Sequence, residues 1–157
     1  MDAKIRKRLC MQGFKENDIA SCKGINMLAR WTPFACAVCG TIGLLIGSSY
    51  YFFALAALTL IGALGPSSFY DYIYNFIISS VLRTEKIPKH GAARRFGCFL
   101  GSVFYLLSGI GFYIHNSLLA YIPASALVIL ALVAAFTHWC FASSIYGFIF
   151  GKEGCCC

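Results

Sequence analysis

The sequence predicts an all-α integral membrane protein: a four-transmembrane-helix bundle built as two helical hairpins, with an amphipathic interfacial helix in the central cytosolic loop. The first observation is composition, because 59% of the 157 residues are hydrophobic and only 12% are charged. A soluble domain of this kind would expose too much apolar surface. The second is that the stretches between the basic blocks contain no Lys, Arg or Glu and a single Asp, as expected where charge would lie in hydrocarbon.

The third observation is length, since a helix needs roughly 20 apolar residues to cross about 30 Å of hydrocarbon. The expected spans are residues 28–47, 50–65, 96–115 and 118–140. A turn at Gly47–Ser49 separates the first two, and a turn at His115–Ser117 separates the last two. We therefore expect each pair to form a helical hairpin. A re-entrant first pair is the competing interpretation.

Residues 68–82, in the loop between the hairpins, predict an amphipathic helix on the cytosolic membrane surface. Its apolar residues recur at helical spacing and are Phe69, Ile73, Phe76, Ile77 and Val81. Its polar residues recur on another face and are Ser68, Asp71, Asn75 and Ser79. A fifth, buried helix is disfavoured because Asp71 would then lie in hydrocarbon.

The basic residues predict the orientation. All 13 Lys and Arg residues lie outside the two short turns, in the N-terminal tail, the central loop and the C-terminal tail. By the positive-inside rule these three regions are cytosolic. The chain then divides into a basic tail (1–27), a membrane domain (28–151) and a Cys-rich cytosolic tail (152–157). We attribute the net charge of +7 to this rule and to contact with the bilayer's anionic lipid headgroups, and we expect no nucleic acid partner.

Nine cysteines are the unusual chemical feature of the sequence. Under the predicted topology all nine lie in the cytosol or the inner leaflet, where a structural disulfide framework is disfavoured. Thiols gathered on one side can ligate a soft metal, carry sulfane sulfur or exchange disulfides. The candidate soft-metal ligands are Cys36, Cys39, His138, Cys140, Cys155, Cys156 and Cys157. The alternative is that cysteines within the spans, Cys98 among them, pack as small hydrophobic residues.

The sequence shows no catalytic or cofactor-binding motif. It contains no phosphate-binding loop, no Ser/His/Asp set and no carboxylate pair, so we do not expect a hydrolytic enzyme. The cofactor that the residues suggest is a soft metal ion held by thiolates. Gly43/Gly47 and Gly97/Gly101 have the spacing that lets helix backbones approach. We expect these pairs to pack the bundle internally, with homo-oligomerisation as the alternative.

Several short motifs follow one another along the chain. Asn26 and Arg30 precede the first span, Gly65-Pro66-Ser67 follows the second, Arg95-Phe96 opens the third, and the segment Cys140–Tyr146 closes the fourth. In this order and spacing they resemble the family of small bacterial membrane proteins called domain of unknown function 4395. The resemblance implies a location in the bacterial inner membrane. Ser143 stands where that family usually has the second Cys of a closing Cys-x-x-Cys, a motif that suggests thiol or sulfur chemistry.

Two functions from different classes are therefore expected. The first is thiol-dependent binding or transport of soft metal or sulfur species, in which Cys36 and Cys39 pass cargo to Cys140 and the C-terminal cysteines. Four-helix mercuric-ion importers are similar in the positions of these cysteines. The second is a non-catalytic accessory subunit of a larger membrane protein complex. A membrane-bound partner in thiol–disulfide exchange, acting through Cys140 alone, is a third interpretation.

Overall fold

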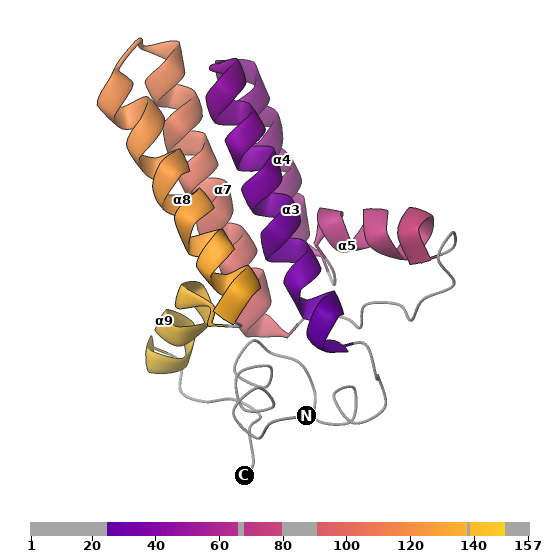
Figure 1. Ribbon diagram of the computed structural model, residues 1–157. Helices are drawn as coiled ribbons and strands as arrows, with labels where there is room; N and C mark the ends of the chain where they lie inside the picture. The colour runs from indigo at the N-terminus through magenta and orange to yellow at the C-terminus, as the bar shows by residue number, and fades with distance from the viewer. Residues whose placement is uncertain (1–24, 66–67, 80–90, 138, 150–157) are drawn as a thin grey trace.

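The computed structural model describes residues 25–65, 68–79, 91–137 and 139–149, and every regular element within these ranges is helical (Figure 1). The elements are α3 (Ile25–Ile46), α4 (Ser49–Leu64), α5 (Phe69–Ile73), the π-helical turn η1 (Tyr74–Ile78), α7 (Ala92–Tyr113), α8 (Ser117–Thr137) and α9 (Phe141–Ile149). The predicted all-helical class is confirmed. The predicted N-terminal tail through residue 24, the Cys-rich tail 152–157 and His138 lie outside the described residues.

Three helices of the described part are long and apolar enough to cross a membrane, over Ala29–Ile46, Ala92–Tyr113 and Ser117–Thr137. Helix α4 has 16 residues, so it extends about 24 Å and falls short of a span of about 30 Å. It qualifies only together with Phe69–Ile77, from which it is bent by 84°. The chain is thus a multi-pass membrane protein with three candidate spans, or four if this bent pair counts as one.

The four long helices run side by side, and the shorter ones gather at one end of them (Figure 1). Helix α4 packs on α7, α3 packs on α8, and α7 also packs on α8 and α9. Helices α3 and α4 follow one another in sequence, yet each makes its main contacts with the second pair. We call the end that carries the Gly47 and His115 turns the turn end, and the opposite end the α5/α9 end.

Both turns at the turn end use a left-handed backbone conformation. Gly47 has φ +64° and donates its N–H to the Gly43 carbonyl over 2.9 Å. His115 has φ 55° and is the non-glycine residue with positive φ in the described part. The next residue, Asn116, donates its N–H to Gly111 over 2.9 Å and accepts from the Leu119 N–H with its side chain over 3.2 Å. These bonds satisfy helix-end groups that would otherwise lack partners.

A close backbone approach between helices occurs at Gly111, whereas Gly43 of the expected pairs packs tightly against side chains, since a Cβ there would lie 2.9 Å from the Phe52 and Tyr51 rings. A Cβ placed on Gly111 would lie 2.3 Å from the Ala120 backbone nitrogen. On Gly97 it would lie 3.6 Å from its nearest neighbour and on Gly101 4.0 Å, both ordinary contact distances. Glycine thus brings α7 and α8 together next to their turn.

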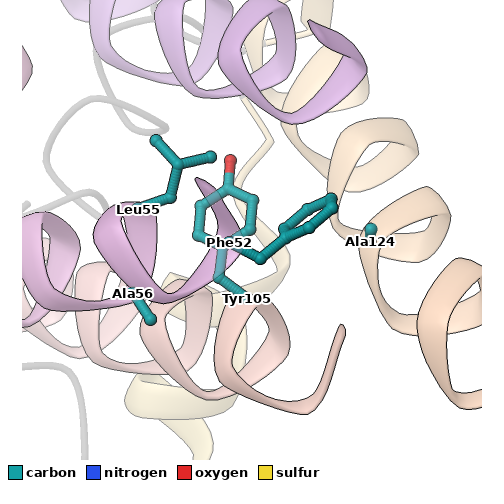
Figure 2. Close-up of a cluster of buried hydrophobic side chains, with 5 residues drawn as sticks. All are labelled: Phe52, Leu55, Ala56, Tyr105 and Ala124. Atoms are coloured by element: carbon teal, nitrogen blue, oxygen red, sulfur yellow. The ribbon is translucent and has the colours of Figure 1, made fainter. Parts of the chain in front are cut away.

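The buried core lies among α4, α7 and α8 (Figure 2) and consists of Phe52, Leu55, Ala56, Tyr105 and Ala124. Phe52 and Tyr105 have no exposed surface. The Phe52 ring stacks on Phe112 with centroids 5.2 Å apart. Aromatic rings of α4 therefore reach both α7 and α3, because the Tyr51 and Phe52 rings also lie against Gly43 of α3. Helices α3 and α4 thus meet through side chains and not through their backbones.

The segment α5–η1 does not expose the polar face that the sequence predicted. Asp71 was expected on an exposed polar face, yet its side chain is completely buried and accepts a hydrogen bond from the Thr32 hydroxyl over 2.5 Å. The Trp31 indole N–H also donates to the Tyr70 carbonyl over 3.0 Å. Outward-facing Phe76 is 84% exposed. The carboxylate is accommodated because it is buried against polar protein groups, not in hydrocarbon.

A separate helix, α9, follows the last long helix instead of extending it. Helix α8 ends at Thr137, whose hydroxyl accepts from the Trp139 N–H over 3.2 Å. Helix α9 then begins with the Ser144 N–H donating to the Cys140 carbonyl over 3.0 Å. This break places residues 140–143 across the end of the bundle, against α7.

Candidate functional site

A cavity of about 140 Å³ lies at the α5/α9 end of the bundle. Its walls come mainly from α3, α7 and α8, and the start of α9, Thr59 of α4 and the start of α5 complete them. Most of the lining is apolar, including Phe104, Leu127, Leu130, Ala131 and Ala134. A few polar side chains enter it among these. A concave apolar site with a small number of polar groups is typical of small-molecule binding.

Three thiols from three different segments line this cavity: Cys36 of α3, Cys98 of α7 and Cys140 just before α9. All three are free and half-buried. The Cys36 sulfur lies 3.2 Å from the Tyr105 hydroxyl, which also donates to the Cys36 carbonyl over 2.9 Å. Tyr105 is part of the buried core, so Cys36 is held in place from behind.

Two of the predicted ligands, Cys36 and Cys140, are thus brought to one cavity, whereas Cys39 is not among its lining residues. Cys39 packs against the core, and its carbonyl accepts from the Tyr51 hydroxyl over 3.2 Å. The remaining predicted ligands, His138 and Cys155–Cys157, lie outside the described residues. No group of three His, Cys, Asp or Glu side chains within the described ranges could hold a metal ion.

Cys98 is a site residue that sequence reasoning assigned to packing. Helices α3 and α7 both begin at the α5/α9 end. Cys36 is the twelfth residue of α3, near its middle, and Cys98 is the seventh residue of α7. Counting residues from that common end places the two thiols about 7 Å apart in depth, so the sequence alone would not have grouped them; the shared cavity wall does.

A polar chain links three elements beside the thiols. The Arg94 guanidinium on α7 donates to the Thr32 hydroxyl on α3 over 2.6 Å, and Thr32 donates to the Asp71 carboxylate on α5. Arg94 and Thr32 line the cavity. Hydrogen bonds to ionised groups are stronger than neutral ones, so this chain fixes α5 against the bundle. From the sequence, Arg94 counted only as one of the basic residues that indicate the orientation of the chain in the membrane.

Ser143 adds a hydroxyl to the cavity wall. Its side chain is 4% exposed, and its oxygen makes no hydrogen bond within the described part of the chain. Burying such a group without a partner costs about 1–3 kcal/mol. The adjacent Ser144 hydroxyl, by contrast, donates to the Cys140 carbonyl over 3.1 Å. The Ser143 hydroxyl is therefore available to a ligand.

Comparison with protein families gives one finding, a match of residues 26–150 to the sequence profile described as Domain of unknown function (DUF4395). The matched region contains α3 through α9 almost entirely, and with them every residue named for the cavity. No curated protein and no solved structure matches the chain. The chain belongs to the DUF4395 family of domains of unknown function.

Proposed function

We propose that this protein binds soft sulfur or metal species through the thiols of the cavity and takes part in their transport at the membrane. One observation carries the proposal: Cys36, Cys98 and Cys140, from three separate segments, line the same cavity. Thiolates are nucleophiles and soft ligands, so a cargo that enters the cavity meets soft ligands on its wall. Cys39, the other candidate ligand in α3, packs against the hydrophobic core instead.

The geometry favours a sulfur species over a metal ion. A soft metal ion needs at least two thiolates within bonding distance of one point, and the described residues contain no group of three His, Cys, Asp or Glu side chains that could hold an ion. A sulfur species needs only one thiol at a time. Metal binding would then draw on two cavity thiols and on cysteines of the C-terminal tail, as the sequence suggested.

We further propose four spans, with the α5/α9 end in the cytosol and the protein in the bacterial inner membrane. Arg94 and Arg95 lie at the start of α7, at that end, which agrees with the positive-inside rule. Helices α5 and α9 would then lie at the inner interface, with exposed Phe76 and Phe148 in contact with lipid. Both termini would be cytosolic.

The test uses the full chain purified in a non-ionic detergent. The protein is incubated separately with Cu(I) and with polysulfide and desalted, and bound metal and sulfur are counted per chain. Wild type is compared with Cys36→Ala, Cys98→Ala and Cys140→Ala, and Cys39→Ala is the matched control. We expect each cavity variant to lose bound sulfur and the control to retain it. No retention by wild type, or equal loss in the control, would overturn the proposal.

The accessory-subunit function is the second candidate and is supported by exposed apolar side chains on α9. Phe148 is 91% exposed and Ile149 61% exposed, which suits contact with lipid, with a larger membrane complex or with a second copy of the chain. Mild solubilisation followed by size analysis separates these cases. A stoichiometric larger protein that stays bound when all three cavity cysteines are replaced would favour the subunit role.

A further inference from the structure

We infer that the ligand of the cavity is a small sulfur-containing oxyanion, of the thiosulfate class. Its charged oxygen atoms bind at Arg94, and its terminal sulfur faces the thiols. This rests on the proposed function, because it assigns the chemical class of the species that the cavity binds. Three observations, on charge, hydrogen bonding and volume, carry it independently.

The charge of the cavity wall is the first. Arg94 lines the cavity, and Asp71, to which it is linked through Thr32, is not among the lining residues. Arg94 thus contributes to the cavity wall, and Asp71 does not. A guanidinium has five N–H donors in a planar fork that matches the oxygen atoms of an oxyanion. The side of the polar chain that faces the cavity is therefore suited to negative charge.

The Ser143 hydroxyl is the second observation. It is buried, lines the cavity and makes no hydrogen bond within the described residues. Cys140 and Ser143 are three residues apart at the start of α9, a spacing that places side chains on a common face of a helix. A ligand that accepts a hydrogen bond from Ser143 would bring its sulfur within reach of Cys140.

Volume is the third. A cavity of about 140 Å³ is close in size to engineered protein cavities that hold one benzene molecule. It therefore has room for a ligand of about six non-hydrogen atoms. Thiosulfate has five non-hydrogen atoms. Its negative oxygen atoms suit Arg94, and its soft terminal sulfur suits the cavity thiols.

The experiment measures thiosulfate affinity by calorimetry on the purified full chain in non-ionic detergent, with sulfate as the anion that lacks the terminal sulfur. We expect thiosulfate to bind more tightly than sulfate. Arg94→Gln should weaken thiosulfate binding by about tenfold or more, and Ser143→Ala by about fivefold. The matched control is Arg95→Gln, which changes the adjacent exposed arginine and should leave the affinity unchanged.

A second pair of variants keeps the test decisive if Arg94→Gln fails to fold. The double variant Asp71→Asn/Arg94→Gln removes both charges of the polar chain together, and it should fold and lose thiosulfate binding. Wild-type affinity in the double variant, no binding by wild type, or equal losses for Arg94→Gln and Arg95→Gln would each overturn the inference.

The thiosulfate experiment can fail while the test of the proposed function succeeds, so the two outcomes can be told apart. Thiol-dependent retention of sulfur from polysulfide without Arg94-dependent thiosulfate binding would reject the oxyanion and leave the proposed function standing. Loss of both would reject both. Anionic phospholipid added to the detergent serves as the competing source of an anionic group. Displacement of thiosulfate by this lipid, with tighter binding of the lipid, would assign the Arg94 site to a headgroup and overturn the inference.

Discussion

The two ends of the bundle are built from the same four helices but are packed in opposite ways. At the turn end, Gly111 lets α7 and α8 touch at the backbone, and stacked Phe52 and Phe112 fill the space between helix pairs. At the α5/α9 end, the helices leave a cavity into which thiols and Arg94 project. Close packing contributes stability, whereas a cavity with buried polar groups weakens it. The difference fits the proposed function, in which the turn end stabilises the fold and the α5/α9 end binds the ligand.

The largest effect on stability should come from removing a large side chain from the packed core. Phe52→Ala removes a ring with no exposed surface and should lower the free energy of unfolding by about 4 kcal/mol. Denaturant titration of the detergent-solubilised protein measures this. Phe148→Ala, at a side chain 91% exposed, is the control and should change stability by less than about 0.5 kcal/mol. Equal losses in the two variants would contradict the contrast between a packed core and an exposed surface.

Breaking the polar chain should give the next largest effect. Asp71→Ala leaves the Thr32 hydroxyl and the nearby Arg94 guanidinium without the carboxylate, and should lower stability by about 3 kcal/mol. Asp71→Asn keeps an oxygen that accepts from Thr32 and should lose less. Both are measured by thermal unfolding. Stability of Asp71→Ala equal to wild type would show that the α5/α9 end does not depend on this chain.

A methyl group at the helix contact of the turn end should have a smaller effect. In Gly111→Ala the new Cβ would meet the Ala120 backbone, so α7 and α8 must separate, at about 2 kcal/mol. Gly147 of α9 has nothing within 4 Å of such a Cβ. Gly147→Ala should therefore be neutral or slightly stabilising, because alanine favours helix. The order of the two melting temperatures tests the prediction, and a reversed order would refute it.

Filling the cavity should have the smallest effect on stability and a large one on binding. Ala131→Leu extends a side chain from α8 into the cavity and should stabilise the protein by about 1 kcal/mol while abolishing thiosulfate binding. Ala124→Leu is the matched change in the packed core, where the residue has no exposed surface, and should destabilise by about 2 kcal/mol. Unfolding and calorimetry on both variants provide the measurement. Destabilisation of both would mean that the cavity is not open space.

The helical class was predictable because it depends on local hydropathy. A run of apolar residues without charge specifies a membrane helix regardless of its partners. Asp71 shows the limit of this reasoning. Its burial depends on Thr32, 39 residues earlier, and on Arg94, and neither partner can be identified from periodicity. The sequence analysis assumed that a carboxylate must lie in water to avoid hydrocarbon, but polar protein groups can also surround it.

The site was predictable only in part, for a related reason. Cys36 and Cys140 were identified by chemical type, whereas Cys98 and Ser143 join them only because α7 and α9 meet at one end of the bundle. Residue type can suggest chemistry, but the grouping of side chains depends on which helices are neighbours. That α3 packs on α8 rather than closely on α4 is a tertiary fact, and the hairpin pattern of the sequence did not predict it.

The polar chain also has a consequence for how the protein is made. Translation delivers Thr32 first, Asp71 second and Arg94 last. While only the first helix pair and α5 have been synthesised, the Asp71 carboxylate lacks the guanidinium that completes the chain in the finished structure. Burial of an uncompensated charge is costly, so α5 would remain at the water interface until α7 arrives. Docking of α5 then marks the arrival of the second helix pair, and a chain that stalls before Arg94 would keep Asp71 accessible to the quality-control proteases of the membrane.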